Sequence, residues 1–136
     1  MTKCPKRGIP SQESVTDLTT LVNLVYYREV AETKAMTEIL SQKIMTEGKK
    51  FYDVWMFEVS DHIQNMALAF AERFALEAAM SNFHVLTVGV SDVGARNVLV
   101  KAIRLHCLLY VKENLGWYMV QGVISPKAAQ AIDTDF

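Results

Sequence analysis

The sequence has few of the residues that make tight turns and cross-links. It contains six glycines, three prolines and two cysteines among its 136 residues. All three prolines lie near the ends of the chain, and a β-sandwich needs more turn residues than this. Two cysteines cannot form a disulfide framework, which favours a reducing compartment over secretion. These shortages together indicate an all-α fold.

An excess of charge of one sign and a long apolar run are also missing. Fourteen Lys and Arg residues face fifteen Asp and Glu residues, which gives a net charge of −1 and no basic footprint for nucleic acid. The longest uncharged stretch, Ala78 to Ser91, is well short of the roughly 20 apolar residues of a spanning helix. The sequence therefore predicts neither a nucleic-acid partner nor a membrane span. With 51% apolar and 21% charged residues, it is typical of one globular domain.

The spacing of apolar residues is that of helices. Residues 1–13 are expected to be a flexible lead and residues 14–136 to form the domain. Apolar residues recur every three or four positions over three ranges, about 14–48, 53–82 and 95–118. Ser125 and Pro126 are typical of the N-cap and first position of a further, truncated helix. The predicted fold is thus a bundle of three long helices plus a truncated fourth.

Three segments depart from a simple helical stripe. In the first helix, the charged residues around Arg28 and Glu32 interrupt the stripe and predict a polar patch midway. In the second, residues 66–71 (MALAFA) are apolar all round and are expected to be buried on more than one side. Residues 83–93 (FHVLTVGVSDV) are rich in β-branched residues and contain a glycine. Because no partner strand is visible for them, a loop is favoured over a strand.

No group of residues has the spacing of a known catalytic or metal site. Glu58 and His62 share a helix face, but a lone pair of this kind is more often a surface contact than a metal site. His106 lies on the apolar face and is expected to be a hydrogen-bonded core residue. Cys107 lies in an apolar run and is expected to be buried and unreactive. The glycines of residues 89–94 do not form a phosphate-binding loop. We therefore assign no catalytic, cofactor-binding or metal-binding residue.

An ordered succession of short motifs carries a family resemblance. The elements are Leu109-Tyr110, Glu113-Asn114, Gly116-Trp117-Tyr118, Gly122 and Ser125-Pro126. Upstream, residues 48–55 (GKKFYDVW) form a turn between two long helical segments, 22–45 and 58–78. Together these features, which span roughly residues 22–132, resemble the C-terminal helical domain of peroxisomal acyl-CoA oxidases.

The resemblance implies a specific activity for a longer protein. Acyl-CoA oxidases are flavoenzymes in which a glutamate removes the α-proton of an acyl-CoA while the β-hydride passes to FAD. Oxygen then reoxidises the flavin, and the products are a trans-2-enoyl-CoA and hydrogen peroxide, in the first step of peroxisomal fatty-acid β-oxidation. In the family, the catalytic glutamate and most FAD contacts lie in an upstream core, and no residue of this chain matches them.

For this chain the resemblance implies an architectural role. The domain would support packing on the core and a homodimer with a second oxidase subunit, without FAD of its own. The location would be the peroxisome, although the final residues DTDF are not a Ser-Lys-Leu address and the cytoplasm is otherwise expected. The ending and the truncated helix favour a fragment.

Two alternatives remain open. The chain could be a stand-alone helical interaction module that pairs with an oxidase subunit and has no catalytic activity. It could also be an unrelated helical bundle that holds an apolar ligand.

Overall fold

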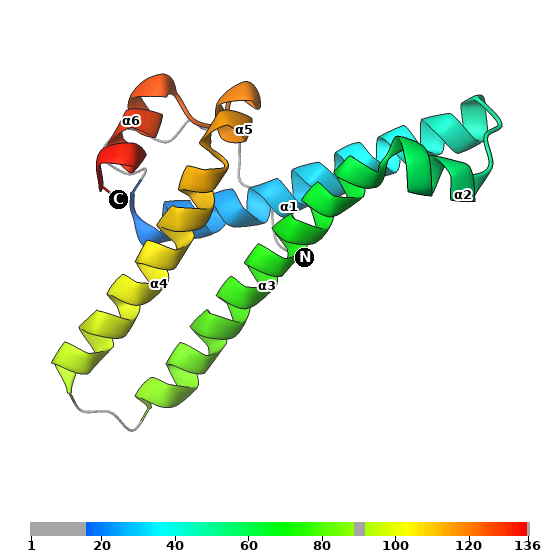
Figure 1. The fold of residues 1–136 in the computed structure, drawn as a ribbon. Helices are drawn as coiled ribbons and strands as arrows, with labels where there is room; N and C mark the ends of the chain where they lie inside the picture. The colour runs from blue at the N-terminus through cyan, green and yellow to red at the C-terminus, as the bar shows by residue number, and fades with distance from the viewer. Residues whose placement is uncertain (1–15, 89–91, 136) are drawn as a thin grey trace.

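The computed structural model describes residues 16–88 and 92–135, and every element within them is helical (Figure 1). The elements are α1 (Leu18–Ser41), the π-helical segment η1 (Gln42–Thr46), α2 (Phe51–Asp53), the π-helical segment η2 (Val54–Glu58), α3 (Ser60–Thr87), α4 (Val93–Glu113), α5 (Leu115–Val120) and α6 (Pro126–Asp135). The predicted all-α fold is confirmed. The expected flexible lead, residues 1–13, lies outside the described residues.

The long helices pair at different places along their lengths. α1 lies beside the first part of α3, while the second part of α3 diverges from α1 and runs beside α4 (Figure 1). α4 returns to the first part of α1, where α5 and α6 fold against it (Figure 1). The described residues therefore form an elongated bundle with two projecting ends, one at the turn between η1 and α2 and the other at the last turns of α3 and the first turns of α4 (Figure 1).

Two glycines mark the turns that follow helices. Gly48 has a φ of 66° and follows η1, so the first helical segment ends where the sequence predicts. Gly122 has a φ of 68° and follows α5. After it, the side chain of Ser125 accepts a hydrogen bond from the Ala128 N–H at 3.2 Å, which confirms the predicted N-cap of α6.

The expected loop over residues 83–93 is wrong at both of its ends. α3 continues to Thr87 and α4 begins at Val93, and only residues 89–91 fall outside the described part. Valine and threonine cost less in a helix than glycine does, so a β-branched stretch does not end a helix that is already formed. The signal for α4 is Asp92, whose side chain accepts a hydrogen bond from the Gly94 N–H at 2.8 Å.

Most of the buried apolar side chains among the described residues belong to two hydrophobic clusters. The larger cluster joins the first part of α1 to α3, α4, α5 and α6, with these members: Leu21, Leu24, Val25, Leu76, Cys107, Leu108, Val111, Tyr118, Ile124, Ala128, Ala129 and Ile132. The smaller cluster joins the second part of α1 to η2 and the start of α3, through Met36, Val54 and Val59. The buried hydroxyl of Tyr118 donates a hydrogen bond to the Leu24 carbonyl oxygen at 2.9 Å, which ties α5 to α1.

The expectation that residues 66–71 are buried on several sides is wrong. Within this stretch only Ala69 is buried, while Leu68 is 56% exposed and Phe70 is 50% exposed. The reason is geometric, because α3 meets α1 along one face here and nothing in the described chain covers the other face. The apolar composition of this turn therefore does not reflect burial within this chain.

Candidate functional site

The first half of α4 is exposed on every face. All residues from Asp92 to Ala102 are solvent-exposed, including Val93, Val98 and Leu99. A helical segment of this length is marginal in water without packing. Consecutive apolar residues, such as Val98, Leu99 and Val100, also point to different sides of a helix. This half of α4 therefore has the composition of a helix that packs against more than one neighbour.

α3 also carries exposed large apolar residues. The α3–α4 surface, as we call it, comprises the exposed large apolar residues from the middle of α3 through Val88 to α4: Leu68, Phe70, Phe74, Met80, Val85, Val88, Val93, Val98, Leu99, Val100 and Leu105. The Phe70 and Phe74 rings stack with centroids 6.0 Å apart, and the Arg73 guanidinium lies 5.1 Å from the Phe70 centroid. Large exposed apolar areas on soluble proteins mark sites of interaction. We take the α3–α4 surface as the candidate functional site.

Sequence reasoning missed this surface, although a signal for it was present. Residues 98–100 read Val-Leu-Val, and three apolar residues in a row cannot share one face of a helix. The apolar stripe expected for this helix runs through Leu99, Ile103, His106 and Tyr110, with Cys107 and Val111 widening it, and only the two widening residues are buried. The side chains that α4 buries are Cys107, Leu108 and Val111.

The predicted core position of His106 is wrong. The His106 residue is exposed, and its ring makes an edge contact with the Tyr110 ring, with centroids 4.4 Å apart. The predicted burial of Cys107 is confirmed, because this residue is fully buried. Burial raises the pKa of its thiol to about 11. A thiol with so high a pKa is almost entirely protonated at neutral pH and is a poor nucleophile.

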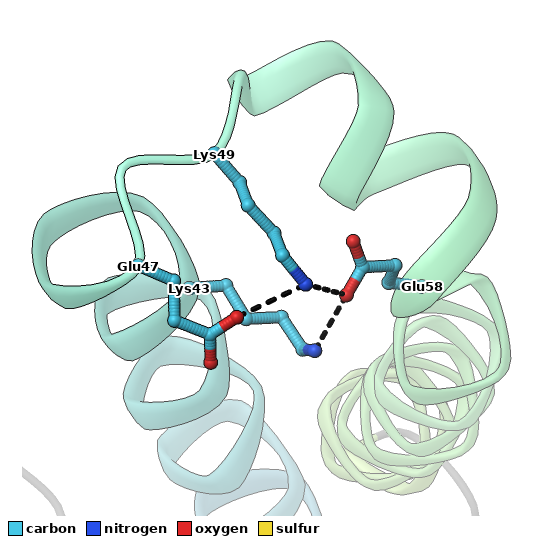
Figure 2. Close-up of polar contacts among 4 residues, drawn as sticks. All are labelled: Lys43, Glu47, Lys49 and Glu58. Carbon is cyan, nitrogen blue, oxygen red and sulfur yellow. Dashed lines mark hydrogen bonds and ion pairs between the residues drawn. The ribbon is translucent and has the colours of Figure 1, made fainter.

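Glu58, one member of the pair weighed as a metal site, is bound by two lysines instead (Figure 2). Its carboxylate accepts a hydrogen bond from the Lys43 Nζ at 2.6 Å and another from the Lys49 Nζ at 2.8 Å. Lys49 also lies 3.0 Å from the Glu47 carboxylate. Hydrogen bonds from Lys43 and Lys49 lower the pKa of Glu58, while the hydrogen bonds that Lys49 donates to Glu58 and Glu47 raise the pKa of Lys49. These contacts join η1 to η2 across the turn, while His62 is exposed.

The described residues also offer no cluster for a metal, and the most buried arginines at the α1–α3 crossing are already paired. Among residues 16–88 and 92–135, no three His, Cys, Asp or Glu side chains gather closely enough to hold an ion. Arg28 and Arg73 lie deepest among the cations at the α1–α3 crossing, but both are paired with glutamates and cannot serve a flavin pyrophosphate without losing those partners. No helix in the described part is long and apolar enough to cross a membrane.

The fold and this surface define a class of protein: an all-helical domain with an uncovered apolar surface suited to packing against another protein unit. A family model described as acyl-CoA oxidase matches residues 17–136. The chain belongs to the acyl-CoA oxidase family. No curated protein and no solved structure gives a significant match to the chain. The family match rules out the alternative of an unrelated bundle that resembles this family by accident.

Proposed function

We propose that this chain is the C-terminal helical domain of an FAD-dependent acyl-CoA oxidase, and that its α3–α4 surface packs against the catalytic core and supports the homodimer. The observation that carries the proposal is the exposure of every residue from 92 to 102 in an apolar helical segment. Removing apolar surface from water contributes about 25 cal/mol of favourable free energy per Å². A protein partner that covers the α3–α4 surface would therefore bind favourably. Membership of the acyl-CoA oxidase family supports an oxidase core and a second oxidase subunit as the partners.

In this proposal, the chemistry belongs to the rest of the enzyme. FAD accepts the hydride when it is bound in the core, and the products of the complete oxidase are a trans-2-enoyl-CoA and hydrogen peroxide. The residues of this chain bind neither substrate nor cofactor, but hold the core and the second subunit in place. Membership of the family also favours a peroxisomal location and a role in fatty-acid β-oxidation.

The test is to find the size of the native protein and what it carries. An antibody raised against residues 51–82 is used for immunoblotting and immunoprecipitation from the source cells. We expect a band several times larger than 15.3 kDa, together with flavin absorbance and acyl-CoA-dependent peroxide formation in the precipitate. A band at 15.3 kDa, with neither flavin nor an oxidase subunit in the precipitate, would contradict the proposal.

The alternative of a stand-alone module rests on the same exposed surface. It predicts a native band at 15.3 kDa that co-precipitates with a separate, larger oxidase subunit. The size of the band therefore distinguishes a domain within the oxidase chain from a module that binds the oxidase.

A further inference from the structure

A layer of charged side chains lies between the two hydrophobic clusters where α1 crosses α3. The polar layer, as we call it, consists of Arg28 and Glu29 on α1 and Glu72 and Arg73 on α3. In sequence, the α1 members lie between Val25 of the larger cluster and Met36 of the smaller one. The layer thus interrupts an apolar helix contact that would otherwise be continuous, as the charged residues in the sequence of α1 predict.

The two ion pairs of the layer have opposite polarity. Arg28 on α1 pairs with Glu72 on α3, and one residue further along, Arg73 on α3 pairs with Glu29 on α1. The second pair is bidentate, with Arg73 Nε 2.8 Å and Nη2 3.1 Å from the two oxygens of Glu29. Arg73 also pairs with Glu77. The pKa of Arg73 is raised, and the hydrogen bond to Glu29 makes the largest contribution.

The side chains of the layer are only 6–19% exposed, and withdrawing charges from water costs stability. Arg28 is 5% exposed, and among the described residues its Nε has no hydrogen-bond partner. Buried ion pairs seldom stabilise a fold more than apolar residues of the same size would, because removing two charges from water costs about as much as their attraction gains. Their best-attested benefit is to select one alignment of two helices over others.

The sequence of α3 shows which residues other alignments would place opposite the charged residues of α1. If α1 slid by one heptad in either direction, Asn65 or Ala79 would take the place of Glu72. In the same way, Met66 or Met80 would take the place of Arg73. Either slip leaves the charges of α1 without an oppositely charged residue at these two positions, whereas apolar contacts are non-directional and tolerate a slip far better. We propose that the polar layer sets the register of α1 against α3.

The experiment measures that register directly with two spin labels. Cysteines replace the exposed residues Asn23 on α1 and Gln64 on α3, in a Cys4→Ser background where Cys107 stays buried. Electron–electron distance measurements are then made on the native layer and on a variant without it, R28M/E29Q/E72M/R73Q. A slip of one heptad changes the separation along the helices by about 10.5 Å.

We expect one distance population with the native layer and at least two in the variant without it. The control is K34M/E38M, which removes an exposed α1 pair with side chains 76% and 69% exposed, and should keep one population. A single population at the native distance in R28M/E29Q/E72M/R73Q would overturn the proposal. If that variant does not fold, E72Q/R73Q, which removes only the α3 charges of the layer, is measured in its place: at least two populations would support the proposal, and a single native population would overturn it.

Discussion

The two halves of α4 have similar apolar content but opposite environments. In the second half, Cys107, Leu108 and Val111 are fully buried against α1 and the C-terminal helices. In the first half, no residue from 92 to 102 is buried. Burial is favourable for the apolar surface of both halves. The difference shows that such surface is buried only where another segment of the chain packs against it. The second half has its neighbours within this chain, while the first half is available to another unit.

The largest expected effect compares the same substitution in the two halves of α4. Leu108 is 0% exposed and Leu99 is 42% exposed. Leu108→Ala should lower the free energy of unfolding by about 2–5 kcal/mol, because it removes buried apolar contacts and leaves a cavity. Leu99→Ala should change it by less than about 0.5 kcal/mol. Urea unfolding of the isolated chain measures both, and equal losses would show that the two halves are packed alike.

A second difference concerns the thiol of the buried half. Burial raises the pKa of Cys107 from 9.0 to about 11, so the folded state holds this proton more tightly than the unfolded state does. The stability contributed by the protonated thiol is fully present below pH 9. It is lost as the pH rises from 9 through 11, where the free energy of unfolding should fall by an amount on the order of 2 kcal/mol. Urea unfolding across this range should follow that fall.

A cysteine placed in the exposed half of α4 serves as the control for the alkaline unfolding experiment. In C107A the part of the alkaline fall due to the thiol should disappear. Adding Leu99→Cys to C107A should not restore it, because an exposed thiol titrates alike in the folded and unfolded chain. A restored fall in that double variant would mean that position 99 is buried in solution.

The helix caps sharpen the comparison further. Ser125→Ala removes the cap of α6, which belongs to the larger cluster, and should lower the global free energy of unfolding by about 1 kcal/mol. Asp92→Ala removes the cap of the exposed half of α4. It should leave global unfolding unchanged and speed hydrogen exchange at residues 94–99 several-fold, since that segment opens locally. A global loss in Asp92→Ala equal to that in Ser125→Ala would contradict the distinction.

The smallest effect on stability is expected on α3. Phe74 is 59% exposed, so Phe74→Ser should change the free energy of unfolding little, yet it removes part of the proposed docking surface. We expect it to weaken co-precipitation of the chain with an oxidase core, while Val120→Ser, at an 85% exposed position on α5, leaves it unchanged. Equal binding by both variants would place the contact elsewhere.

The helix positions could be predicted from the sequence more fully than the burial. Gly48 and the Ser125–Pro126 pair mark real ends and starts, because backbone conformation and capping are local properties. His106 was misplaced because a helical stripe gives a periodicity but not its exact direction, and a rotation of one residue moves the buried face to Cys107 and Leu108. The loop expected over residues 83–93 failed because weak β-propensity does not stop a helix.

The candidate site was the least predictable part. The α3–α4 surface consists of residues that look like core residues in the sequence, and nothing local distinguishes an apolar face covered by this chain from one covered by another. The sequence alone determined the all-α fold, most of the turns and the family resemblance, since these depend on short-range propensities and on the order of motifs. Only the tertiary structure decided which apolar residues are buried and which charges meet, because α3 contacts α1 and then α4 along different parts of its length, and that path is set by packing between distant segments.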